Sequence, residues 1–316
     1  MRFIVCLECM KIDGVLDEPF PIGDGLMITN NKSHFSQIIR AKHLNESLGG
    51  LETSYFELPG AVVIFKDMEV DNPEDDFPEL NFFLRSVRAY LVFLWLIKDN
   101  SIRYGIGYAY NQKLKNYRIR SNTLGNPYFN ANGEISEVLF SKDEILNSGF
   151  FVGNFVSACK QEDFPSKTAI TKYGKSKINR MEIAGLHLEQ SRTAYDLGLK
   201  ISNYCSFFEC LFSTSTNELT HQLSERMALY LGDSKDSRKE IYSQVKKAYQ
   251  VRSSVVHGGL ISKRDFSVIQ ETASFCDDIA RSILKNLYSN IEHHKMFAFE
   301  DDKVITDFFM DLLFRD

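Results

Sequence analysis

Proline is scarce in this sequence: there are 7 prolines and 18 glycines in 316 residues, too few for a collagen-like or low-complexity chain. The 44% of hydrophobic and 25% of charged residues are those of an ordinary folded protein, and the length suits one or two domains. Six cysteines in so long a chain do not make a disulfide framework. We therefore expect a folded cytoplasmic protein whose thiols are reduced.

No uncharged hydrophobic run is long enough to predict a signal peptide or a membrane span. Residues 1–7 are apolar apart from Arg2, but Glu8 and Lys11 soon interrupt the run. The most apolar long window, residues 77–97, contains Glu79 and two arginines, which is typical of a well-buried helix. We expect neither export nor a membrane partner.

Motifs for cofactors and metals are missing as well. The sequence has no P-loop, HExxH or GxSxG motif, and Gly105-x-Gly107 lacks the third glycine and the following helix of a dinucleotide site. Cys6-x-x-Cys9 has no second cysteine pair or histidine partner at a zinc spacing, so a strand with alternating sides explains it better. We expect no cofactor and no metal.

The net charge of −5 is unevenly distributed along the chain. It is −6 over residues 1–165, +5 over residues 166–295 and −4 over residues 296–316. Taken whole, the charge argues against a nucleic-acid-binding protein, but the middle segment alone suits a polyanion.

The N-terminal part of the sequence mixes strand and helix patterns, and we interpret residues 1–165 as an α+β domain. Its Asn/Gly-rich stretch predicts a loop or hairpin connection at residues 122–133. Segments rich in β-branched and aromatic residues predict strands at residues 2–9, 25–29, 61–65 and 102–110. Helical periodicity predicts helices at residues 33–47 and 77–98.

From about Phe164 only helical periodicity remains, so we place a domain boundary near residues 165–174 and an all-α bundle over residues 166–295. Two of its helices are expected to begin at capping boxes, Ser215 with Glu218 and Ser237 with Glu240. The predicted bundle helices span residues 179–212, 215–231, 237–257 and 265–293, followed by an acidic tail (residues 296–316) with a short amphipathic helix at 304–314.

The end of the third bundle helix carries the residues best suited to chemistry, among them Arg252, Ser253 and His257 before a Gly-Gly stop. Arginine supplies a permanent charge and a planar fork that suits phosphate, and histidine exchanges protons near neutral pH. Cleavage of RNA without a metal needs such groups: a base for the 2′-hydroxyl, an acid for the leaving oxygen and a cation for the phosphorane. A second pair, Arg180 and His187, shows that spacing alone does not identify a site.

Three blocks, NYCSFFECLF at residues 203–212, NELTHQLSERMA at 217–228 and YQVRSSVVHGG at 249–259, resemble the HEPN (higher eukaryotes and prokaryotes nucleotide-binding) superfamily, most closely its Apea-like branch. The resemblance covers residues 175–290 or so, and its most specific part is Tyr-x-x-Arg-x4-His-Gly. It implies a bundle of four or five helices that often dimerises, bringing two Arg–His motifs into one cleft that cleaves RNA without metal.

By that resemblance Arg252 and His257 are the catalytic pair, and Glu209 matches a recurring accessory position on the first helix. Where the family often has Asn, Asp or His directly after the arginine, this chain has Ser253, which can donate a hydrogen bond but cannot act as acid or base at neutral pH. We expect the Tyr249 ring to stack on an RNA base.

Each of these residues has a purely structural alternative. His257 can be an ordinary helix C-terminal residue favoured by the helix dipole. Arg252 can pair with Glu209 to tie two helices together, which is compatible with catalysis, and Tyr249 can be part of the core.

The first hypothesis is a homodimeric, metal-independent endoribonuclease that leaves a 2′,3′-cyclic phosphate and acts as a toxin or antiviral (anti-phage) effector. Its N-terminal domain would be a sensor or regulator that answers to a regulatory protein or a phage-derived trigger. The alternative is a non-catalytic module that binds RNA, a nucleotide or a protein. A third interpretation is the regulatory half of a two-protein system, silenced by a partner that docks on the acidic N-terminal domain.

Overall fold

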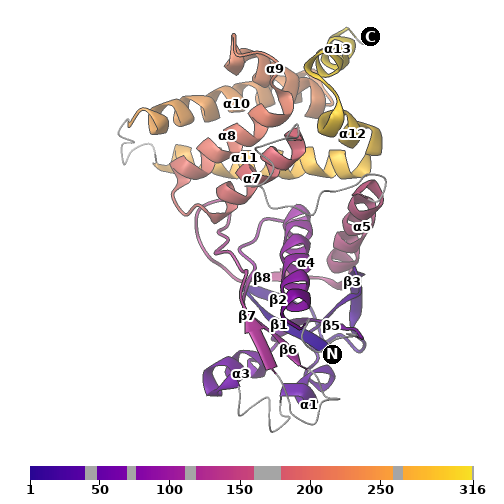
Figure 1. Cartoon of the computed structure of the whole chain (residues 1–316). Helices are drawn as coiled ribbons and strands as arrows, with labels where there is room; N and C mark the ends of the chain where they lie inside the picture. The colour runs from indigo at the N-terminus through magenta and orange to yellow at the C-terminus, as the bar shows by residue number, and fades with distance from the viewer. Residues whose placement is uncertain (40–47, 70–75, 111–118, 160–178, 259–265, 315–316) are drawn as a thin grey trace. The chain divides into compact units, whose positions relative to one another are not determined.

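The computed structural model describes residues 1–39, 48–69, 76–110, 119–159, 179–258 and 266–314 (Figure 1). The chain divides into two compact units: unit 1 is Met1–Tyr128 with Ile135–Gly153, and unit 2 is Phe129–Glu134 with Asn154–Asp316. All strands in the described residues belong to unit 1, and unit 2 is helical. The predicted order, α+β followed by a helical region, is thereby confirmed, whereas the predicted boundary at residues 165–174 lies outside the described residues.

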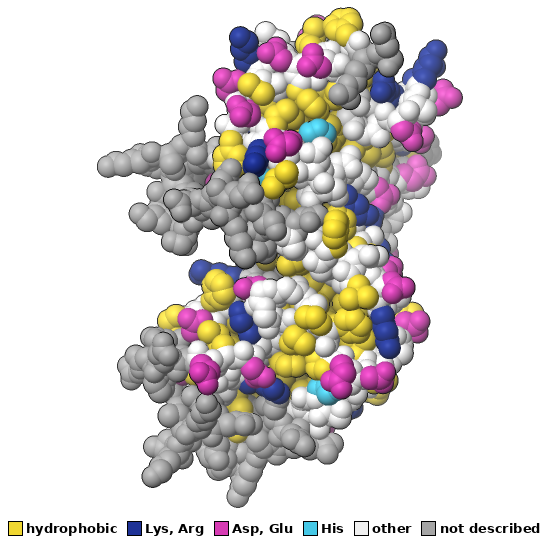
Figure 2. All heavy atoms as spheres, turned by 90° about the vertical axis from the view of Figure 1, so that its right-hand side faces the viewer, with side chains coloured by type: hydrophobic (Ala, Val, Ile, Leu, Met, Phe, Trp, Pro, Cys, Tyr) yellow, Lys and Arg dark blue, Asp and Glu magenta, His cyan; other side chains and the backbone are white. Residues whose placement is uncertain are grey.

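Acidic and basic side chains are interspersed on the face that Figure 2 shows, wherever described residues form it. The uneven charge along the sequence therefore does not produce a continuous basic surface on that face.

Unit 1 is built on a six-stranded antiparallel sheet of order β3-β4-β5-β1-β6-β7, beside a separate parallel pair of β2 and β8. The four predicted strands are present, although the first is divided at Cys9, whose φ is 62°. Sequence patterns missed β2, β3, β7 and β8, which are three or four residues long and too short to show alternation. The strands are β1 (Arg2–Glu8), β2 (Met10–Ile12), β3 (Phe20–Gly23), β4 (Leu26–Thr29), β5 (Val62–Asp67), β6 (Arg103–Tyr110), β7 (Ile119–Asn122) and β8 (Val138–Phe140).

Helix α4 (Asp76–Ile97) covers one face of the sheet. It confirms the helix that was predicted at residues 77–98. The rings of Phe3 and Phe83 stack with centroids 5.7 Å apart, and a Cβ on Gly107 would lie 2.5 Å from Leu84, so strand and helix are in close contact. Among the described residues this is the one helix long and apolar enough to cross a membrane, and more than half of its most apolar window is buried. That burial is typical of a core helix. Helix α5 (Lys142–Cys159) follows β8.

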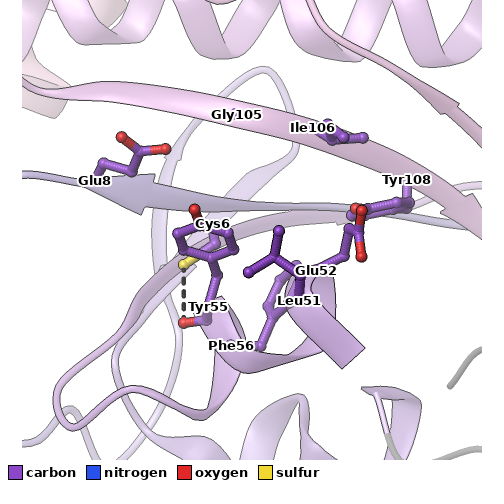
Figure 3. A pocket seen from close by; sticks show the side chains of 9 residues that line it. All are labelled: Cys6, Glu8, Leu51, Glu52, Tyr55, Phe56, Gly105, Ile106 and Tyr108. Carbon is purple, nitrogen blue, oxygen red and sulfur yellow. Dashed lines mark hydrogen bonds between the residues drawn. The ribbon is translucent and has the colours of Figure 1, made fainter. Parts of the chain in front are cut away.

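The opposite face is covered by short helices: η1 (Lys32–His34), α1 (Ser36–Ile39) and α3 (Gly50–Glu57). Phe56 of α3 packs between Phe35 and Tyr108, with ring centroids 6.4 and 6.3 Å away. Because α3 has only eight residues, part of this face stays open beside it as a cavity (Figure 3). Of the helix predicted at residues 33–47, the described part is a 3-10 turn and one α-helical turn.

Unit 2 is a bundle in which α8 packs against α7, α9, α10 and α11. The predicted apolar face of α8 is buried, with Ile201, Cys205 and Phe208 fully enclosed. The helices are α7 (Arg180–Thr193), α8 (Leu197–Phe212), α9 (Leu219–Leu231), α10 (Lys235–Val256), α11 (Phe266–Ser289), α12 (Ile291–Phe299) and α13 (Asp302–Leu313).

Two predicted long helices are each broken in two by an internal cap. The prediction of one helix over residues 179–212 is wrong, because the Asp196 side chain accepts a hydrogen bond from the Leu199 N–H and starts α8 anew. The last bundle helix ends at Ser289, where Asn290 caps α12 by accepting from the N–H groups of Glu292 and His293.

Both predicted capping boxes are wrong, although the ends of their helices are confirmed. Helix α9 begins after Glu218, which is left-handed (φ 50°) and caps nothing with its side chain. Helix α10 begins earlier than predicted, since Ser234 accepts from the Ser237 N–H. The tail helix is present as α13, which Asp301 caps.

Candidate functional site

The C-terminal end of α10 is where the sequence places its candidate residues. His257 is the C-cap residue, and its backbone N–H donates to the Ser253 carbonyl at 3.2 Å. Gly258 follows with φ 70°, a left-handed conformation that ends a helix and suits glycine. Gly259 lies outside the described residues.

Three of the candidates meet where α10 crosses α8. The Tyr249 hydroxyl donates to Glu209 Oε1 at 2.6 Å, and an Arg252 guanidinium nitrogen lies 3.2 Å from the same oxygen. The Arg252 guanidinium carbon also lies 5.6 Å from the centroid of the Tyr249 ring. The carboxylate on α8 thus holds two donors from α10, and the ion pair between Arg252 and Glu209 that the sequence suggested is present.

This polar cluster is largely buried, which bears on the protonation of Tyr249. Burial, reinforced by the Glu209 carboxylate, raises the pKa of Tyr249 far above its usual value, so the phenol stays protonated and can donate. Burial also raises the pKa of the neighbouring Cys205 thiol, which therefore stays neutral. In the described part of the chain, Arg252 Nε is buried and has no hydrogen-bond partner, while 30% of the side chain is exposed. The guanidinium is therefore anchored on one side and has hydrogen-bonding capacity left.

Ser253 and His257 lie on the surface of the same helix end and are not part of this cluster. Both residues are exposed. No hydrogen bond or ion pair among the described residues joins either side chain to Glu209, Tyr249 or Arg252. The structure therefore brings Glu209, Tyr249 and Arg252 together and leaves an exposed imidazole at the end of the same helix.

Tyr249 is placed differently from the sequence-based expectation. The residue is only 6% exposed and its hydroxyl is used by Glu209, so little of the ring is left for stacking on an RNA base. Tyr249 and Arg252 are three residues apart on one helix and so share a face, a signal from which a common partner could have been predicted.

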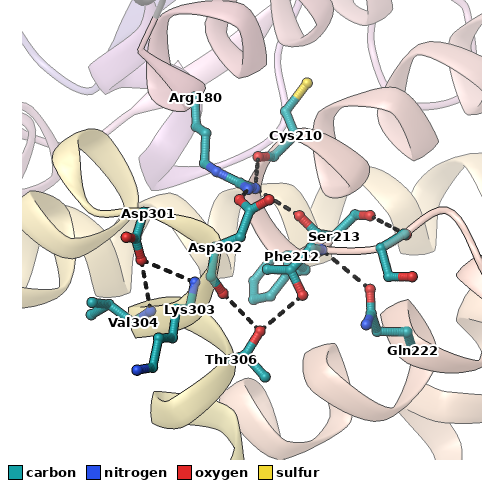
Figure 4. Close-up of polar contacts among 12 residues, drawn as sticks. Arg180, Cys210, Phe212, Ser213, Gln222, Asp301, Asp302, Lys303, Val304 and Thr306 are labelled. Carbon is teal, nitrogen blue, oxygen red and sulfur yellow. Dashed lines mark hydrogen bonds and ion pairs between the residues drawn. The ribbon is translucent and has the colours of Figure 1, made fainter.

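The second Arg–His pair is a structural one. Arg180 donates to the carbonyl oxygens of Cys210 and Ser213, at 3.1 and 2.7 Å, and pairs with the Asp302 carboxylate (Figure 4). His187 Nδ1 is buried without a hydrogen-bond partner among the described residues. Both terminal nitrogens of this arginine are engaged in joining α7, the end of α8 and α13.

Arg226 has a comparable role. The residue is 6% exposed and donates to the Phe212 carbonyl at 2.7 Å, while its guanidinium lies 5.0 Å from the Phe309 ring centroid. It joins α9 to α8 and α13.

Comparisons of the chain with protein-family models, with curated proteins and with solved structures found no significant match.

Proposed function

We propose that unit 2 is a HEPN-type bundle and a metal-independent endoribonuclease that acts as a homodimer. The observation that carries the proposal is the end of α10, where Arg252 is anchored by Glu209 and Tyr249 and the exposed His257 follows as the C-cap residue. The order of the three sequence blocks supports the same assignment.

In the proposed reaction Arg252 binds the scissile phosphate and His257 exchanges protons. A neutral His257 removes the proton from the 2′-hydroxyl, whose oxygen attacks the phosphorus. The bond from phosphorus to the 5′-oxygen breaks, and that oxygen takes a proton from the protonated His257 of the second copy. The products are a 2′,3′-cyclic phosphate and a 5′-hydroxyl, and Arg252 stabilises the charge of the phosphorane between them.

Glu209 and Tyr249 act through Arg252 in this scheme. A carboxylate that accepts from both Tyr249 and Arg252 fixes the direction of the guanidinium, and the 30% of the Arg252 side chain that is exposed can meet a phosphate oxygen. Ser253 is exposed one residue further on and would orient the phosphate through its hydroxyl.

The biological role that we propose is a cytoplasmic toxin or anti-phage effector. Unit 1 would then act as the sensor or restraint of the nuclease, responding to a regulatory protein or a phage-derived trigger. A non-catalytic role in binding RNA is the second candidate, favoured because no hydrogen bond or ion pair among the described residues joins His257 to the Arg252 cluster.

The test is to incubate the purified full chain with total RNA in EDTA and to identify the ends of the products. We expect cleavage that leaves 2′,3′-cyclic phosphates and that is lost in His257→Ala but kept in His187→Ala. Equal cleavage by wild type and His257→Ala would refute the catalytic assignment. RNA binding with a steep salt dependence and no product would support the binding module instead.

A further inference from the structure

Unit 1 contains a cavity of about 240 Å³ between helix α3 and strands β1 and β6 (Figure 3). Its opening follows from the strand register. Val5 pairs with Gly107 and Leu7 with Tyr104, so β6 has one residue more than β1 between these pairs and bulges there. Gly105 lies in this bulge, and a Cβ on it would contact only the Glu8 carboxylate, at 3.5 Å. Among the described residues, the bulge and the missing side chain leave this part of the sheet face uncovered.

The walls of the cavity are mostly apolar. Phe56 and Tyr108 are buried, with 3% and 4% of their surface exposed. At the rim, Leu51, Tyr55 and Ile106 expose 69%, 44% and 42% of their surface although they are large hydrophobic residues. Apolar side chains converging on a cavity from a helix and a strand are typical of a small-molecule site.

One carboxylate in this cavity is not neutralised by the described residues. Glu8 is paired with Arg103 at 2.8 Å. Glu52, in the first turn of α3, has no ion pair with any described residue, and Figure 3 shows its side chain beside Tyr108. Burial and, second, the Glu52 carboxylate raise the pKa of Tyr108 to about 12. The cavity therefore combines aromatic walls with one negative charge, a combination that attracts cations.

The cysteine of the cavity does not suggest covalent or metal chemistry. Burial raises the pKa of the Cys6 thiol to about 12, so the sulfur stays protonated and is a poor nucleophile and ligand. Its thiol lies 3.6 Å from the Tyr55 carbonyl oxygen, to which it donates.

We propose that this cavity binds a small organic cation with a flat apolar body, whose charged group pairs with Glu52 and whose body lies between Tyr55 and Ile106. The volume limits the ligand to about a dozen non-hydrogen atoms, since it lies below the usual range of drug-sized pockets. This site lies in unit 1, so it does not depend on the function proposed for unit 2.

A series of three probes with one shape and different charges tests the proposal: phenethylamine, 2-phenylethanol and phenylacetate. Binding to the full chain is measured by titration in NMR spectra. We expect roughly tenfold tighter binding of the amine than of the alcohol, from an ion pair and a cation–π contact, and no binding of phenylacetate. Equal affinity for amine and alcohol, or tighter binding of phenylacetate, would overturn the proposal.

Two variants locate the site. Glu52→Gln should remove the preference for the amine without weakening the alcohol, whereas Glu57→Gln on the same helix, whose side chain does not line the cavity, should leave the tenfold preference intact. Gly105→Val should fill the cavity and weaken both probes at least tenfold, with an unchanged circular dichroism spectrum as the folding control. The proposal would be refuted if Glu52→Gln kept the preference for the amine or if Gly105→Val still bound the probes as tightly as the wild type.

Discussion

The two Arg–His pairs of unit 2 are seven and five residues apart in sequence, and they have opposite surroundings in the fold. Arg180 donates to two backbone carbonyls and to Asp302, and His187 is turned inward. Arg252 is held by one side-chain carboxylate, is 30% exposed, and is followed by an exposed histidine at a helix end. The comparison teaches that an Arg–His motif is defined less by its spacing than by whether the helix continues past it.

The physical reason lies in where each pair sits on its helix. Arg180 is the first residue of α7, and His187 lies within the same helix, whose side chains pack against α8. His257 is the residue at which α10 ends, so its ring is not covered by a next turn. A helix end at a glycine thus leaves a titratable group on the surface next to an anchored cation.

The sharpest test of this comparison replaces each of the two arginines with alanine and compares the rates of RNA cleavage. Arg252→Ala should lower the rate of RNA cleavage about 100- to 1000-fold, because a cation at the phosphorane is lost. Arg180→Ala should keep the rate per folded molecule within about twofold, since its donors are used by the protein itself. Single-turnover cleavage of a short RNA measures both rates. Similar decreases in rate in the two variants would contradict the different roles given to the two arginines.

The free energy of unfolding should depend on Arg180, although the cleavage rate should not. Arg180→Ala leaves the carbonyl oxygens of Cys210 and Ser213 without a charged donor, so we expect the free energy of unfolding to fall by about 2 kcal/mol. Asp302→Asn is the matched control: its side chain is 63% exposed, and its loss should cost about 0.5 kcal/mol. Urea denaturation followed by circular dichroism measures both, and an equal cost would show that the ion pair rather than the carbonyls carries the contribution.

The anchor of Arg252 can be weakened one group at a time. Tyr249→Phe removes one hydrogen bond to Glu209 and should destabilise the protein by about 1 kcal/mol. Glu209→Gln keeps an acceptor for Tyr249 but removes the charge that holds Arg252, so we expect cleavage to fall about tenfold with little change in stability. The same assays apply, and a Glu209→Gln enzyme with the wild-type rate would exclude a positioning role.

A third histidine, His294, shows what burial does to an imidazole in this unit. It is 6% exposed and burial lowers its pKa, so the unfolded chain binds a proton more readily than the folded one. Its contribution to stability is present above the unfolded pKa and is lost as pH falls through about 6.5 towards the lowered value. His294→Phe should therefore lose less stability than wild type between pH 7.5 and 5.5 in urea denaturation, and an identical pH dependence would contradict this.

Long periodic segments were predictable from the sequence, and short or capped ones were not. Helix α4 and strand β6 are long enough for their patterns to repeat, and most of the residues of β6 and half of those of α4 are buried. The break at Asp196 was missed because apolar periodicity continues across it, while one capping side chain decides where α8 starts. The cavity of unit 1 depends on a register shift between two strands distant in sequence, which no local pattern contains.

What the sequence determined by itself is the order of a strand-rich and a helical part and the presence of Arg252, His257 and Glu209 as chemically suited residues. Only the tertiary structure decided that Glu209 and Tyr249 anchor Arg252, that Arg180 holds three helices together, and that Glu52 faces an open cavity. Composition and periodicity follow from bonded neighbours along the chain, whereas the burial and partners of a charged group are set by residues that folding brings beside it.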